Sequence, residues 1–166
     1  MLKSKIEDNL NEQVKKEAYS SNLYLSMASW AENNGFSGIA DWMYAQAEEE
    51  KMHMLKIIKY INERAGHAII PAIDKPPIEH GTVKEMFEAV YKHEQFISES
   101  INEIVALTIE EKDYTTNSWI QWFVNEQIEE ESSVSAILDK LNMLGSENMY
   151  LFDKDIMGMR SVNSAE

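Results

Sequence analysis

The chain contains no cysteine. Without thiolates it can form no disulfide, iron–sulfur cluster or thiolate zinc site, so any metal must bind through histidine nitrogen or carboxylate oxygen. Basic residues are also few, because 15 Lys and Arg stand against 29 Asp and Glu, which gives a net charge of −14. Such an acidic chain repels the phosphates of nucleic acids and of anionic membranes and attracts cations. We therefore expect cationic partners and no nucleic acid.

Long apolar segments are missing as well. No apolar run approaches the roughly 20 residues that span a bilayer, and the N-terminal segment lacks the apolar core of a secretory signal. These absences predict a cytoplasmic protein that has no membrane contact. The chain has 166 residues, of which 44% are hydrophobic, so we expect one packed domain over residues 1–166.

Helix-breaking residues are scarce and confined to a few places. The six glycines and three prolines lie at positions 35–38, 66–81, 145 and 158. Between these places, apolar residues recur at steps of three and four, which is typical of helices with one buried face. The pattern predicts four long helices and a short amphipathic one, over residues 5–32, 38–65, 83–111, 115–144 and 147–157.

The lengths of the connections predict how these helices are arranged. The links around residues 33–36 and 111–114 are short, so each pair of helices should form an antiparallel hairpin. The 17 residues from Gly66 to Thr82 could reach about 56 Å, whereas a helix of roughly 28 residues is about 42 Å long. This link can therefore cross the whole bundle. We predict an all-α four-helix bundle in up-down-down-up order, with a long crossover between the second and third helices and a short fifth helix.

Polar residues interrupt each apolar stripe about a dozen positions into its helix. Glu50 follows Glu17 by 33 positions, and Gln127 follows Glu94 by the same interval, so the two hairpins are pseudo-equivalent. The second helix of each hairpin adds another polar residue three positions on, which lies on the same helix face. The six groups that this pattern directs inward are Glu17, Glu50, His53, Glu94, Gln127 and Glu130.

Such a layer of carboxylates needs positive charge. Each unpaired charge in a dry core costs on the order of several kcal/mol, against a net domain stability of roughly 5–15 kcal/mol. Two divalent ions would neutralise the four glutamates, and oxygens with one imidazole suit iron or manganese. Pairing with buried Lys, Arg or water is the alternative, but the inward faces carry no Lys or Arg. A purely structural bundle would explain the helices but not the matched spacing of the polar layer.

These residues resemble the iron-oxidising centre of the ferritins, over nearly the whole chain. The positions that carry the resemblance are Glu17, Tyr24, Glu50, His53, Glu94 and the run from Glu126 to Glu130. Bacterioferritins have a second Glu-x-x-His motif and a haem-binding methionine directly after the first motif's glutamate, where this chain has Lys51. The Gln127-x-x-Glu130 pair is instead similar to the bacterial non-haem ferritins, so we expect no haem.

The resemblance implies an iron-storage protein with ferroxidase activity. In that family two Fe(II) ions are oxidised by dioxygen, and the Fe(III) passes to a mineral inside a homo-oligomeric shell of 24 subunits. One ion would be bound by Glu17, Glu50 and His53. The other would be bound by Glu50, Glu94 and Glu130, with Gln127 beside it.

The same resemblance assigns further residues around the centre. Tyr24 would hydrogen-bond the centre and supply an electron, although a plain core tyrosine is the alternative. Glu49, Glu126 and Glu129 would form a third iron site that shares Glu130, although runs of charge are usually solvated surfaces. Animal ferritins have acidic residues lining their threefold pores where this chain has Asn117 and Ile120, so we do not expect iron to enter by that route.

Two related families fit the sequence less well. A rubrerythrin-like peroxide reductase needs four cysteines for its electron-transfer module, and the chain has none. A miniature ferritin that protects DNA binds its iron between subunits and lacks the intrahelical set found here. The acidic charge also offers no DNA-binding arm.

Overall fold

The computed structural model describes residues 2–145 and 148–160. In this part of the chain four long helices are followed by two short ones: α1 (Ser4–Asn33), α2 (Ser37–Glu63), α3 (Val83–Glu110), α4 (Tyr114–Leu144), α5 (Met149–Asp155) and the 3₁₀ helix η2 (Ile156–Met159). The all-α prediction is confirmed. The predicted fifth helix starts at residue 147, which lies outside the described residues, and the rest of that prediction corresponds to α5 and the beginning of η2.

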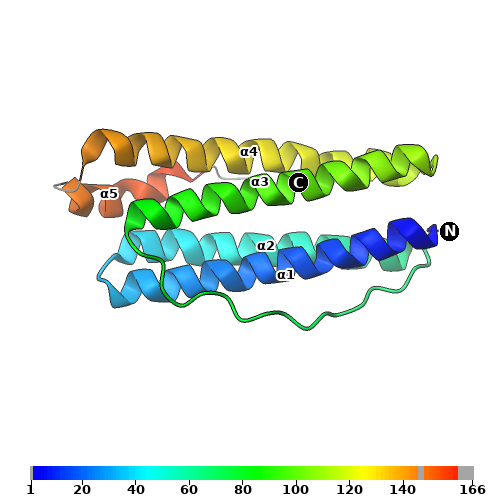
Figure 1. The fold of residues 1–166 in the computed structure, drawn as a ribbon, viewed down its shortest axis with the longest axis horizontal. Helices are drawn as coiled ribbons and strands as arrows, with labels where there is room; N and C mark the ends of the chain where they lie inside the picture. The colour runs from blue at the N-terminus through cyan, green and yellow to red at the C-terminus, as the bar shows by residue number, and fades with distance from the viewer. Residues whose placement is uncertain (1, 146–147, 161–166) are drawn as a thin grey trace.

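The two hairpins pack into a bundle (Figure 1). α1 and α2 run antiparallel, as do α3 and α4, and the segment between α2 and α3 runs back along the length of the bundle. α3 therefore starts at the same end as α2 and runs parallel to it. This confirms the up-down-down-up order and the long crossover.

The helix predicted over residues 38–65 was two residues too long at its C-terminal end. Ala65 has a positive φ of 58°, which ends the helix in a left-handed cap. The amide of Gly66 donates to the carbonyl of Ile61 at 2.9 Å, and the amide of Ala65 donates to that of Asn62 at 3.1 Å. This pair of bonds satisfies carbonyls of the last turn, as in a Schellman motif.

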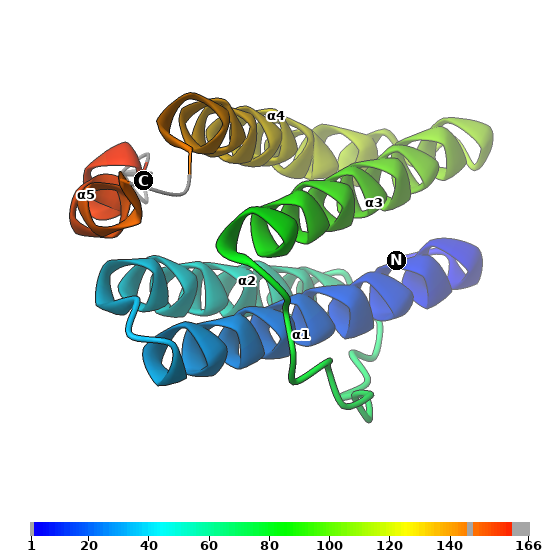
Figure 2. The ribbon, with the colours of Figure 1, turned by 60° about the vertical axis from the view of Figure 1, so that its left-hand side comes forward.

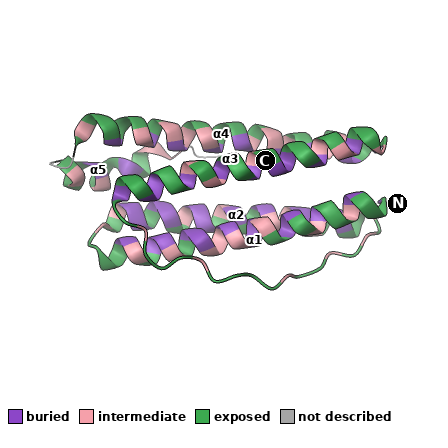
Figure 3. Ribbon diagram, in the orientation of Figure 1, coloured by how far each residue is buried: buried purple, intermediate pink, exposed green. Residues whose placement is uncertain are grey.

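The core is divided into two apolar clusters along the bundle axis. One cluster lies near the α1–α2 turn and includes Tyr24, Trp42 and Phe87. The other lies towards the opposite end and includes Ile57 and Phe123. Buried positions face the interior along all four long helices (Figure 3). The predicted polar layer falls between the two clusters in every long helix, so it is enclosed by hydrocarbon above and below.

The C-terminal segment docks at the start of α2 (Figure 2). The amide of Ile39, in the first turn of α2, donates to the Asp153 carboxylate at 2.8 Å, and an acidic group is favourable at a helix N-terminus. A Cβ on Gly38 would lie 1.8 Å from the carbonyl oxygen of Asp153. Phe152 and Ile156 are buried in the adjacent core cluster. The absence of a side chain at Gly38 therefore allows this close docking.

Among the residues that the structure describes, no helix is both long enough and apolar enough to cross a bilayer.

Candidate metal centre

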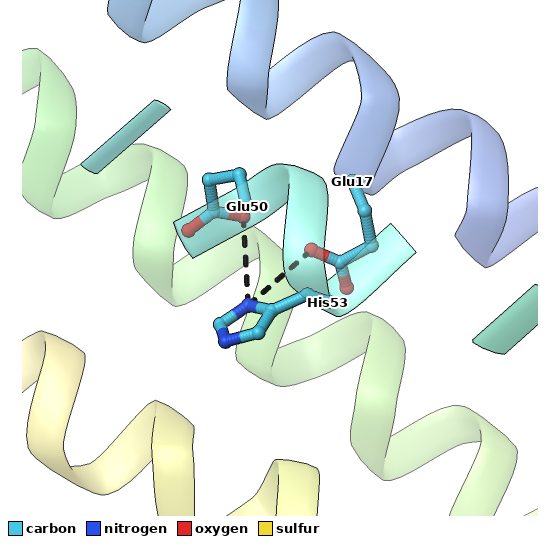
Figure 4. A group of neighbouring side chains, drawn as sticks. All are labelled: Glu17, Glu50 and His53. Carbon is cyan, nitrogen blue, oxygen red and sulfur yellow. Dashed lines mark ion pairs between the residues drawn. The ribbon is translucent and has the colours of Figure 1, made fainter. Parts of the chain in front are cut away.

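Three predicted ligands converge at mid-height of the first hairpin. Glu17 comes from α1, whereas Glu50 and His53 come from α2, and all three are buried. Nδ1 of His53 lies 4.0 Å from an oxygen of Glu17 and 3.8 Å from an oxygen of Glu50 (Figure 4). Ligand atoms about 2.1 Å from a divalent ion lie about 3–4 Å from one another. The spacing therefore suits a cation between the three groups.

One atom of this group lacks a hydrogen bond. Among the described residues, Oε2 of Glu17 is buried and has no hydrogen-bond partner, whereas the other oxygen accepts a 2.8 Å bond from Gln13. A buried carboxylate oxygen without a partner is costly. This oxygen lies next to His53, so a metal ion at this position would supply the missing interaction.

The second hairpin contributes two more predicted ligands, Glu94 and Glu130, and hydrogen bonds hold both carboxyl groups. Glu94 of α3 accepts a bond from the Tyr24 hydroxyl and a 3.1 Å bond from the Gln127 amide. Glu130 of α4 accepts a 2.6 Å bond from Gln46 of α2. Tyr24 thus contacts Glu94, one of the predicted ligands, and Gln127 lies directly against the same carboxyl group.

Burial strongly affects ionisation in this layer. It raises the pKa of Glu94 to about 7, and it raises the pKa of Glu130 well above the ordinary value. Burial also raises the pKa of Glu50 well above its usual range, with further increases from the charges of Glu94, Glu17 and Glu130. These shifts favour the protonated carboxyl groups, whereas a bound cation would favour the carboxylate forms.

His53 shows the opposite shift. Burial, followed by the nearby charge of Lys56, lowers the pKa of His53 to about 4. The imidazole is therefore neutral at physiological pH and has a lone pair available for a metal. Trp122 and Phe123 pack edge-on against the ring, with centroids 5.4 and 5.8 Å away, and restrict its orientation. A neutral imidazole among four carboxyl groups is a donor set that fits iron.

The residues expected at a third site are only partly brought together. Ligand atoms of Glu49, His53 and Glu126 lie within 4.8 Å of one another. Burial raises the pKa of Glu126, and the charges of Glu129 and Glu49 raise it further. Glu129 is exposed and does not belong to this group of ligand atoms.

Three residues near the centre were not identified from the sequence. Gln13 and Gln46 each lie four positions before a ligand glutamate, Glu17 and Glu50, and this shared i, i+4 spacing was a signal for both. Arg160 pairs with Glu49 and donates to Gln46 at 2.8 Å. No local pattern in the sequence indicates the contacts of Arg160.

Comparison with known proteins agrees with this geometry. The ferritin-like domain family matches residues 7–144. The chain belongs to the ferritin-like family. Its function is accordingly iron storage with ferroxidase activity, and the buried Glu–His cluster is consistent with a di-iron site.

Individual relatives cover nearly the whole ferritin chain. A probable bacterial non-haem ferritin-like protein of Haemophilus influenzae is 46% identical, over 94% of this chain and 96% of its own. A bacterial non-haem ferritin of Campylobacter jejuni is 40% identical, over 94% and 95% of the two chains. The crystal structure of an open-pore ferritin from Archaeoglobus fulgidus superposes with a TM-score of 0.91, at 38% identity over 93% and 96% of the two chains.

Proposed function

We propose that each subunit binds two Fe(II) ions as substrate in the polar layer. Glu17, Glu50 and His53 bind the first ion, and Glu50 bridges to the second. The second ion is bound by Glu50, Glu94 and Glu130, with Gln127 beside it. The observation that carries this proposal is the buried oxygen of Glu17, which has no hydrogen-bond partner among the described residues and adjoins a neutral imidazole.

The carboxyl groups of the centre balance the charge of the incoming Fe(II) ions by releasing protons. The pKa values of the four carboxyl groups are raised, chiefly by burial, so entry of Fe(II) displaces protons from them. The two Fe(II) ions would each give one electron to dioxygen, reducing it to the peroxide level, and the Fe(III) would move on to a mineral. Burial raises the pKa of Tyr24 well above its ordinary value, so its hydroxyl stays protonated and holds Glu94 in place. The resemblance to ferritins further implies that Tyr24 is an electron donor to the centre.

Several further assignments belong to the same proposal. We take residues 1–166 as one ferritin-like domain that assembles into a homo-oligomeric, iron-containing shell of 24 subunits in the cytoplasm, without haem. The proximity of Glu49 and Glu126 to His53 supports a third iron site there. Exposed Glu129 would have to turn towards that site, and Glu130 would be shared with it.

The proposal is tested by adding Fe(II) in air and separating the products by size. We expect ferric absorbance to co-elute with a large assembly, and an iron-free monomer would contradict the proposed storage function. His53→Ala should slow the first fast phase of Fe(II) oxidation in a stopped-flow experiment. The matched control is His67→Ala, because His67 is exposed and lies in the crossover segment. An unchanged rate in His53→Ala would remove that residue from the centre.

A further inference from the structure

Arg160 makes an unusual set of contacts for a residue near the chain terminus. Its guanidinium pairs with Glu49 and donates to the side-chain oxygen of Gln46 at 2.8 Å. It also donates to the backbone carbonyls of Ala45 at 3.3 Å and Trp42 at 3.5 Å. All four acceptors lie on α2; Glu49 directly precedes the ligand Glu50, and Gln46 lies four residues before it. Arg160 thus joins the C-terminal segment to the helix that carries the centre.

The bond from Arg160 determines which end of the Gln46 side-chain amide faces the centre. A guanidinium can only donate hydrogen bonds, so the oxygen of Gln46 must face Arg160. The NH₂ group must then face the other way, and it donates to Glu130 at 2.6 Å. If the Gln46 amide were reversed, its oxygen would face an oxygen of Glu130 in the ionised form that binds a metal, and the two would repel each other. Arg160 therefore selects the orientation in which Gln46 holds Glu130.

The docked segment fixes Arg160 in this position. Ile156 is fully buried four residues earlier, and Phe152 is 3% exposed. Asp153 accepts the bond from Ile39 at the start of α2. The Arg160 side chain is only 20% exposed. The guanidinium is thus held by packing as well as by its ion pair, which favours a defined position over a mobile surface contact.

We propose that Arg160 is a positioning residue for the second ion, acting through Gln46 to orient the carboxylate of Glu130. The proposal rests on the assignment of Glu130 to that ion. Residues that orient metal ligands through hydrogen bonds typically affect metal affinity by roughly 10–100-fold. Arg160 is one bond further from the ligand, so we expect a loss of about 3–10-fold.

The test uses Co(II) alone as the probe, with the full-length assembled protein, in isothermal titration calorimetry and visible absorption. Arg160→Ala should weaken binding of the second Co(II) about 3–10-fold and leave the first unchanged. Gln46→Leu removes the direct bond to Glu130 and should weaken binding of the second Co(II) more, by roughly 10–100-fold. The double variant should be no weaker than the more affected single one, because both changes break the same chain of bonds. Arg160→Lys, which keeps the charge but lacks the planar fork, should give an intermediate affinity.

Arg64→Ala is the matched control. Arg64 is also 20% exposed and also forms an ion pair, with Asp113, but it caps the far end of α2. Its loss should lower stability without changing either Co(II) affinity, which separates positioning from general destabilisation. Circular dichroism and size exclusion verify that each variant folds and assembles.

The Co(II) titrations distinguish failure of the proposed di-iron function from failure of the positioning role of Arg160. Wild-type protein that binds fewer than two Co(II) per subunit would contradict the proposed di-iron function itself. If the wild type binds two, the positioning role is overturned by an unchanged second affinity in Arg160→Ala, or by losses that add fully in the double variant. It is also overturned if Arg160→Ala only gains a third ion at Glu49 and keeps the first two affinities.

Discussion

Glu94→Gln should change how the stability of the metal-free protein depends on pH. Burial raises the pKa of Glu94 from 4.5 to about 7, so the folded state keeps a proton that the unfolded chain has released. The unfolding free energy therefore falls as pH rises from about 4.5 through about 7. A difference of about 2.5 pKa units corresponds to about 3 kcal/mol. Glutamine has no proton to lose, so the variant should gain about 3 kcal/mol relative to wild type between pH 4.5 and pH 8.

Urea unfolding of both proteins, with a chelator present and at one fixed protein concentration, measures this difference. The matched control is Glu88→Gln, because Glu88 lies on the same helix but its side chain is 48% exposed in a pair with Lys84. Losing this exposed pair should change stability by less than about 1 kcal/mol. If the difference between Glu94→Gln and wild type is the same at pH 5 and pH 8, the buried proton on Glu94 is refuted.

Three further predictions test the centre and its support. Glu50→Ala should lose the first fast phase of Fe(II) oxidation while keeping its helical circular dichroism, because Glu50 is proposed to bridge both ions; a normal fast phase would contradict that role. Tyr24→Phe removes the hydroxyl bond to Glu94, so infrared titration should find the carboxyl pKa of Glu94 shifted upward, and a downward shift would contradict the bond. Gly38→Ala places a Cβ 1.8 Å from the Asp153 carbonyl and should cost about 1–3 kcal/mol in urea unfolding; an unchanged midpoint would show that α5 is not held closely there.

The sequence alone was sufficient to predict the helices, because glycine and proline are confined to the turns and apolar residues repeat at helical spacing. It also determined the topology, since the length of the Gly66–Thr82 link allows the crossover. The polar layer followed from the repeated interval of 33 positions. The end of α2 was less predictable, because the left-handed cap uses Ala65 instead of glycine.

Only the tertiary structure decided which side chains meet across the bundle. Periodicity assigns a residue to a helix face, but it does not say which group on another helix faces it. Gln46 and Glu130 are 84 positions apart, and Arg160 is 114 positions from Gln46. Glu126 is half-buried and its ligand atoms lie close to those of Glu49 and His53. Glu129, three positions further on, is exposed and lies outside that group. The sequence thus determined the layer and its ligand types, whereas packing of the helices and docking of α5 decided which groups hold the ligands in place.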